Sequence, residues 1–209
     1  MRSSSIAQST RQSGFDRPLI LGIGGTLREG STSERALQIS LEAARAAGAR
    51  THAITGADLA LPLYELGAPL TEQAAAFVEM LRACDGLIIS SPSYHGGVSG
   101  LIKNAIDYVE ELRPDVRIYL DGRAVGTIVC AAGAQSIGTT LSGLRSMVHA
   151  LRGWPSPLGA GINTAELLDG KFQNESIQQL QVVGRQVAGF AMMQLSHEGR
   201  AYERVCAAE

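Results

Sequence analysis

The stretch SSPSYHGGVSGLIKNAIDY contains residues that could hold a flat ligand. Pro92 stiffens the turn after an apolar run, and Gly96 and Gly97 expose backbone amides that can hydrogen-bond the edge of a ring. Tyr94 and His95 are placed to border such a ring. An exposed loop histidine and a metal ligand are the alternatives for His95, but no partner histidine or carboxylate stands at a metal-like spacing. We therefore expect a planar ligand here and no metal.

The stretch GGTLREGSTS, residues 24–33, has the composition of a phosphate site. Gly24 and Gly25 permit close backbone approach, Arg28 supplies a cation, and the helix that follows points its amino end outward. Hydroxyl groups come from Thr26, Ser31, Thr32 and Ser33. The stretch matches neither GxGxxG nor GxxxxGK followed by Ser or Thr, which favours a monophosphate over a dinucleotide or a nucleoside triphosphate. An ordinary helix start with a serine cap is the alternative interpretation.

A third stretch, AAGAQSIGTT at 131–140, again combines small residues with hydroxyl groups and the amide side chain of Gln135. Taken alone, it is nearly as compatible with an ordinary loop between a strand and a helix. The three stretches become specific together if they follow the first, third and fourth strands of one parallel sheet. Ligands of open α/β sheets bind at the rim beyond the carboxyl ends of the strands, where the strand order reverses.

Strands and helices are predicted to alternate along the whole chain. Compact apolar runs at 19–25, 84–92 and 122–134 are typical of strands buried on both faces of a parallel sheet. Weaker strand patterns cover 50–59 and 154–163. Helical spacing of apolar residues predicts helices over 31–49, 71–83, 100–112, 139–152 and 177–199. The alternation predicts a doubly wound α/β fold, a three-layer α/β/α sandwich around a five-stranded parallel sheet.

Composition narrows the classes of function. The 209 residues show no internal linker or repeat, which favours one domain at 18–199 between tails at 1–17 and 200–209. With 18 Lys plus Arg against 20 Asp plus Glu, the net charge is −2, which disfavours nucleic acid and anionic membranes as partners. Three widely spaced cysteines, no secretory signal and no membrane span predict a cytoplasmic protein.

Over residues 19–163, and more loosely into the last helix, the sequence resembles the NADPH-dependent FMN reductase family of flavodoxin-like proteins. GGTLREGSTS is similar to the family's phosphate loop, and SPSYHGGVSGLIKNAIDY to its flavin-ring loop and the following helix. The resemblance implies a flavodoxin-like fold, FMN as cofactor and NADPH or NADH as hydride donor. It assigns the FMN phosphate to Thr26, Arg28, Ser31 and Ser33, the isoalloxazine ring to Pro92, Ser93, Tyr94, His95, Gly96 and Gly97, and the pyrimidine side of that ring to Gly133 and Gln135.

Lys103 and Asn104 belong to the same motif, but on a helix face structure and subunit packing are open alternatives, so we place them outside the site. No catalytic side chain is expected, because the cofactor carries the chemistry and the protein contributes placement and electrostatics around the ring. The resemblance implies an FMN-dependent NAD(P)H oxidoreductase that reduces a quinone, a free flavin or another small acceptor. A dehydrogenase of one biosynthetic metabolite and a flavodoxin-type electron carrier are the alternatives, the carrier being disfavoured by the net charge of −2.

Two further expectations concern assembly and retention of the cofactor. Apolar faces at 100–112 and 177–195 predict a homodimer, and family members that resemble this chain often pair further into tetramers. Val98 stands where the flavin-supplying branch of the family carries a bulky Tyr. A helix that starts regularly at Ser99 is therefore expected, and a preorganised pocket of this kind predicts FMN held as a prosthetic group.

Overall fold

The structure is a computed structural model that describes residues 17–206, with side chains described for 17–197. Apart from Arg17, the expected amino-terminal tail lies outside the described residues, as do residues 207–209 of the expected carboxyl-terminal tail. The strands are β1 Leu19–Gly24, β2 Arg50–Thr55, β3 Gly86–Tyr94, β4 Gly97–Val98, β5 Ala124–Ala131, β6 Trp154–Pro155 and β7 Ala160–Asn163. The helices are α1 Thr32–Ala46, α2 Glu72–Ala83, α3 Gly100–Asp107, α4 Ala134–Ala150 and α5 Asn174–Cys206, with 3₁₀ helices at Gly56–Leu59, Tyr108–Leu112 and Thr164–Glu166.

The sheet has the order β2-β1-β3-β5-β6, and β7 pairs with β5 further along the same edge. All of these pairs are parallel. The chain leaves β1 for β2 on one side and returns to β3 on the other, so the strand order reverses between β1 and β3. This is the flavodoxin-like order, whose ligands bind at that reversal point.

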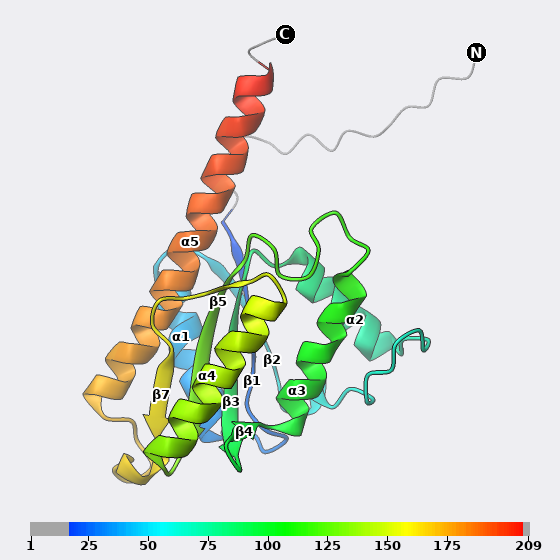
Figure 1. Ribbon diagram of the computed structural model, residues 1–209. Coiled ribbons are helices and arrows are strands. Elements are labelled where there is room, and N and C mark those ends of the chain that lie inside the picture. The colour runs from blue at the N-terminus through cyan, green and yellow to red at the C-terminus, as the bar shows by residue number, and fades with distance from the viewer. Residues whose placement is uncertain (1–16, 207–209) are drawn as a thin grey trace, which may run out of the picture.

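Helices cover both faces of the sheet, as Figure 1 shows: α1 and α5 lie on one face, and α2, α3 and α4 on the other. The central strands alternate between two cores, because successive side chains of a strand point to opposite faces. In β1, Leu21 and Ile23 pack with α2, α3 and α4, whereas Ile20 packs with α1 and α5. All three side chains are 2% exposed or less. The strands buried on both faces that the apolar runs predicted are therefore confirmed.

Among the described residues the sheet has seven strands, where the sequence predicted five. The expected strand at 154–163 is divided into β6 and β7. Between them Pro157 has no amide hydrogen to give to a neighbouring strand, and the amide of Leu158 instead donates to Gln186 Oε1 of α5 at 3.1 Å. The other addition is β4, which folds back antiparallel onto the end of β3.

Several boundaries also differ from the periodicity-based expectation. The strand predicted at 50–59 ends at Thr55, where Gly56 takes a positive φ of 55° and a 3₁₀ turn begins. The helix predicted at 100–112 is α-helical only to Asp107 and then tightens into a 3₁₀ helix. Helix α4 begins at Ala134 instead of 139, so that its first turn includes Gln135. The last helix runs from Asn174 to Cys206, beyond the predicted limits at both ends.

Close contact between α1 and α5 holds the layer on one face of the sheet together. The hydroxyl of Ser40 in α1 donates to the carbonyl of Leu180 in α5 at 2.7 Å, and Ser40 is wholly buried. One turn further along α5, a Cβ atom placed on Gly184 would collide with the carbonyl oxygen of Ser40. Glycine at 184 is therefore required for the two helix backbones to approach as closely as they do.

This contact can be tested by adding one methyl group. Gly184→Ala should lower the free energy of unfolding by about 1–3 kcal/mol, because the backbone of α1 cannot move aside as a flexible side chain can. Gly189→Ala, in the same helix but with nothing within 4 Å of the added atom, should raise it by about 0.5–1 kcal/mol through helix propensity. Urea unfolding followed by far-UV circular dichroism measures both, and equal effects would show that the helices are not in tight contact at Gly184.

Candidate functional site

Three loops meet at the carboxyl end of the sheet because β1, β3 and β5 are neighbours in it. We call residues 24–33 the phosphate loop, residues 92–98 the ring hairpin and residues 131–135 the third loop. The amide of Gly25 donates to the carbonyl of Ser90 at 3.2 Å, and the hydroxyl of Ser90 donates to the carbonyl of Ser33 at 2.8 Å. These bonds join the phosphate loop to the end of β3. The contiguous rim expected from the sequence is present.

The phosphate loop turns sharply at Gly25, whose φ is +92°. A Cβ atom there would lie 3.1 Å from the Cβ of Glu34, in a backbone conformation that side chains rarely adopt. The loop then closes on Thr26, whose hydroxyl accepts from the amide of Arg28 at 3.1 Å. Glycine and a small hydroxyl residue are therefore needed for the shape of this loop as well as for any ligand.

Helix α1 starts with a cap built from the predicted serines. Ser31 accepts a hydrogen bond from the amide of Glu34 at 3.3 Å, and its hydroxyl lies 3.5 Å from that of Ser33. Both serines are only 2% exposed. The carboxylate of Glu34 reaches back to the amide of Gly30 at 2.8 Å and also accepts from Thr55 Oγ1 at 3.3 Å. The serine cap considered from the sequence is therefore real.

Thr26 and Arg28 differ from the two serines because they reach solvent. Thr26 is half-buried and Arg28 is exposed. Within residues 17–197 the Arg28 guanidinium has no hydrogen-bond or ion-pair partner. Its charge is therefore available to an anion at the loop, whereas Ser31 and Ser33 form the floor beneath it.

The ring hairpin joins β3 to β4 through a two-residue turn. Ser93 pairs with Val98 and Tyr94 with Gly97, which leaves His95 and Gly96 at the tip. Both tip residues have positive φ, 54° for His95 and 81° for Gly96, as a type I′ turn requires. Tyr94 is 56% exposed and His95 is also exposed. The segment expected as an open loop is thus a tight hairpin that presents its tip to solvent.

Two serines close the base of the ring hairpin and start the next helix. The hydroxyl of Ser91 accepts from the amide of Ser99 at 3.0 Å and donates to the carbonyl of Pro92 at 2.7 Å. Ser99 is the cap of α3 and accepts from the amide of Ile102 at 3.3 Å. Pro92 is tolerated in a central strand because β1 has ended opposite Ser90, so only β5 pairs with β3 there.

The third loop leads directly into α4. Gly133 is the residue before the helix, with extended backbone, and no side chain caps the first-turn amides. These amides carry the positive end of the helix dipole. Gln135 lies exposed in the first turn, beside them. Gly133 and Gln135 are therefore positioned to offer hydrogen bonds to a polar ligand edge.

Three residues that the sequence reasoning left outside the site organise this rim. Ser136 and Thr140 of α4 hydrogen-bond Ser93, each with an oxygen–oxygen distance of 2.6 Å. Asn104 of α3 accepts from the amide of Tyr64 at 2.9 Å and donates to the carbonyl of Pro62 at 2.8 Å. Asn104 thus anchors the loop after β2, which favours the structural alternative for this residue. Only the hydroxyls in the third stretch and the position of Asn104 in the motif pointed to these contacts.

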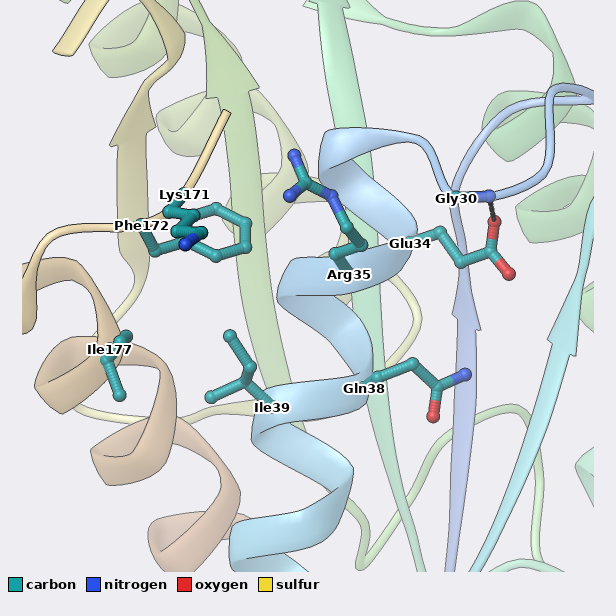
Figure 2. A pocket seen from close by; sticks show the side chains of 8 residues that line it. All are labelled: Gly30, Glu34, Arg35, Gln38, Ile39, Lys171, Phe172 and Ile177. Atoms are coloured by element: carbon teal, nitrogen blue, oxygen red, sulfur yellow. Dashed lines mark hydrogen bonds between the residues drawn. The ribbon is translucent and has the colours of Figure 1, made fainter. Parts of the chain in front are cut away.

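A cavity of about 460 Å³ lies beside the rim, between α1 and the start of α5 (Figure 2). Ile39, Phe172 and Ile177 give it an apolar wall. Arg35 lies over the Phe172 ring at 5.1 Å and donates to the carbonyl of Gly170 at 2.6 Å. Of the phosphate loop only Gly30 borders the cavity, and none of the twelve predicted site residues lines it. It is therefore distinct from the candidate site.

The described cysteines contribute no nucleophile. Burial raises the pKa of Cys84 to about 11 and that of Cys130 to about 12. Both thiols therefore stay protonated at neutral pH, and a protonated, buried thiol is unreactive. The side chain of Cys206 lies outside the described side chains.

Among the described residues, no helix is both long and apolar enough to cross a membrane.

A flavodoxin-like sheet with a glycine turn and an exposed hairpin at its reversal point defines an α/β protein of the doubly wound class, in which ligands bind at that edge. The chain belongs to the NADPH-dependent FMN reductase family, whose sequence profile matches residues 18–165. It is therefore an FMN-dependent NAD(P)H oxidoreductase.

Individual relatives agree with this assignment. The chain is 30% identical, over 187 residues, to an NAD(P)H-dependent FMN reductase of Pseudomonas aeruginosa, a match that covers 78% of this chain and 92% of that protein. It is 36% identical over 81 residues to an FMN-dependent NADPH-azoreductase of Staphylococcus haemolyticus, covering 39% of each chain. The fold is similar to that of the NAD(P)H:(acceptor) oxidoreductase FerB of Paracoccus denitrificans, with a TM-score of 0.66, 19% identity, and coverage of 85% of this chain and 98% of that chain.

The role of Arg28 can be tested by a substitution that leaves the loop backbone intact. Arg28→Ala should weaken FMN binding by about ten- to a hundredfold, the loss of one charge-assisted contact of about 1.5–3 kcal/mol. Arg185→Ala, which removes the same charge from an exposed position on α5, should leave the affinity unchanged. Fluorescence titration of the apoprotein with FMN measures both, and unchanged affinity in Arg28→Ala would assign the phosphate to amides and hydroxyls alone.

Proposed function

We propose that one FMN binds along the phosphate loop, the ring hairpin and the third loop, and that its electrons pass to a small acceptor such as a quinone or a free flavin. The observation that carries this proposal is the convergence of three features on one rim: a cation with no partner among residues 17–197, an exposed positive-φ turn, and a helix start without a side-chain cap. Each of these offers donors to a ligand that combines a phosphate with a flat ring.

The phosphate end of the site fits an FMN monoester. Arg28 supplies the charge, Thr26 a reachable hydroxyl, and Ser31 and Ser33 the floor of the loop. Glu34 already occupies the amide of Gly30, so the remaining donors favour a single phosphate over a longer polyphosphate. The sharp turn at Gly25 supports this fit, because a side chain there would meet Glu34 and fill the loop.

The ring end of the site is formed mainly by backbone. Pro92, Ser93, Tyr94, His95, Gly96 and Gly97 would border the isoalloxazine, and Gly133 and Gln135 its pyrimidine side. Bound FMN supplies a ring that takes a hydride from the nicotinamide and releases electrons to the acceptor. The chain's own contribution is to hold the ring in place and to set neutral hydrogen-bond donors against the edge where negative charge develops.

The start of α3 bears on whether FMN stays bound. Val98 lies in β4, paired with Ser93, and α3 begins as a regular α-helix at Gly100 with Ser99 as its cap. The strand pairing and the helix cap thus hold the ring hairpin in place without a ligand, and a preorganised site loses less entropy on binding. These features support FMN as a prosthetic group.

Retention of FMN and the choice of acceptor can be measured on the purified protein. We expect a yellow protein with an FMN dissociation constant at or below the micromolar range, about −8 kcal/mol or better, and ping-pong kinetics with NADPH or NADH and a quinone. Equilibrium dialysis and steady-state oxidation of both nucleotides against quinones, free FMN and azo compounds provide the measurements. A colourless protein that binds FMN more weakly than about 10 µM and reduces it as a saturable substrate would contradict the prosthetic assignment.

We also propose a cytoplasmic homodimer or homotetramer. Cytoplasmic placement is supported by the thiols of Cys84 and Cys130, which are both unpaired and buried. Part of the apolar face of α5 that suggested assembly packs into the core, since Val183 and Val187 are wholly buried. Apolar surface remains available for assembly at two places. Trp154 is 59% exposed and its ring centre lies 6.1 Å from that of Phe190, and Met193 is 56% exposed.

Light scattering after size exclusion tests the assembly. The expected mass is two or four times the 22.0 kDa of one chain. Met193→Lys should shift the mass toward the monomer, because a charge would be buried in the α5 interface. Leu168→Lys, at another exposed apolar side chain, should leave it unchanged. A monomer mass for the unaltered protein at micromolar concentration would contradict the proposal.

A further inference from the structure

We propose that Ser136 and Thr140 of α4 are positioning residues for the ring hairpin, and that they act through Ser93. The inference rests on the FMN site proposed above. It also changes the part assigned to Ser93, whose hydroxyl holds the hairpin in place instead of bonding the ring.

The three side chains form a compact cluster that we call the hydroxyl junction. Ser93 Oγ lies 2.6 Å from Ser136 Oγ and 2.6 Å from Thr140 Oγ1, and it lies 3.4 Å from the carbonyl oxygen of Ser136. Thr140 is 2% exposed, and Ser93 and Ser136 are half-buried. Hydrogen bonds at this depth compete little with water, so each contributes more than it would on the surface.

A count of donors and acceptors shows how far the junction occupies the Ser93 hydroxyl. A serine hydroxyl donates one hydrogen bond and accepts two. Ser93 can accept from Ser136 and Thr140 and give its own proton to the carbonyl of Ser136. In this arrangement no hydrogen-bonding capacity is left for a ligand, and if Ser93 instead donates to one of the two oxygens at 2.6 Å, a single acceptor position remains. Its hydroxyl therefore serves mainly as a link between β3 and α4.

The ring hairpin needs such a link because it is weak on its own. Strand β4 has two residues and pairs only with β3, and an isolated two-stranded hairpin is marginally stable. His95 adds strain, because a non-glycine residue at a φ of 54° lies in a sparsely populated conformation. Among the hydrogen bonds of residues 17–197, the hydroxyl junction and the bond between Ser91 and Ser99 at the base join the hairpin to helices.

The junction also fixes two parts of the proposed ring site relative to each other. Helix α4 follows Gly133 and carries Gln135 and Ser136 in its first turn, with Thr140 about one turn further on. The methyl group of Thr139 would lie 3.9 Å from a Cβ on Gly96, so the tip of the hairpin faces the same helix. The ring edge and the pyrimidine end are therefore held by one rigid element.

The experiment compares Ser136→Ala and Thr140→Val with Thr140→Ser, which keeps the hydroxyl, and with Ser142→Ala, an exposed serine on the same helix. We expect Ser136→Ala and Thr140→Val each to weaken FMN about two- to tenfold, the effect of one neutral hydrogen bond, and to lower kcat more than they change KM for NADPH. Thr140→Ser should restore both quantities, and Ser142→Ala should match the unaltered protein.

Hydrogen–deuterium exchange of the apoprotein gives a reading that needs no flavin. Amides of residues 93–98 should exchange faster in Ser136→Ala and Thr140→Val than in Thr140→Ser or Ser142→Ala. Unchanged exchange there, or FMN affinity and kcat within twofold of the unaltered protein in both variants, overturns the inference. So does an equal loss in Thr140→Ser, which would indicate sensitivity to packing alone. If the unaltered protein binds no FMN, the proposed function fails, and the exchange comparison still decides whether the junction holds the hairpin.

Discussion

The parallel pairing of β3 with β1 on one side and with β5 on the other is the interaction on which the site depends. It aligns Gly24 with Ser90 and Pro92 with Cys130, so the loops that follow β1 and β5 flank the end of β3. Because β3 continues to Tyr94 after β1 has stopped, its last residues project beyond the sheet. The ring hairpin is this projection, folded back on itself. A phosphate loop on one side and a helix start on the other follow directly from the register.

The chemistry of the site follows from what its residues lack as well as from what they offer. Backbone amides, hydroxyl groups and the Arg28 guanidinium can bind and orient a ligand, but they do not exchange electrons. The described thiols are buried and protonated. An oxidoreductase built in this way must obtain its redox chemistry from a bound cofactor, which agrees with membership of the FMN reductase family. The protein then acts through geometry and fixed dipoles, which are set during folding and not during the reaction.

Arg123, at the opposite end of the sheet, shows why a residue type alone does not define a site. It is 1% exposed, and its guanidinium donates to the carbonyls of Arg82, Cys84 and Tyr119. Burial lowers the pKa of Arg123, because it disfavours the charged form. Its donors are directed to backbone carbonyls of the amino-terminal edge, where it holds the loops that lead into β3 and β5. Arg28 has the same chemistry, but its side chain is exposed and lies in the loop that follows the carboxyl end of β1, which makes it a ligand-binding candidate.

The sequence by itself determined the alternation of strands and helices, the glycine turn of the phosphate loop and the composition of the ring hairpin. These features depend on residues that are close together in the chain, so periodicity and local conformational preference reveal them. Tertiary structure alone decided that Ser93 bonds Ser136 and Thr140, that Asn104 anchors the loop after β2, and that Gly184 lies against Ser40. Each of these contacts joins segments that are 40 or more residues apart. No local pattern encodes such a partner, because the partner is chosen by the order of strands in the sheet and by the packing of helices on its faces.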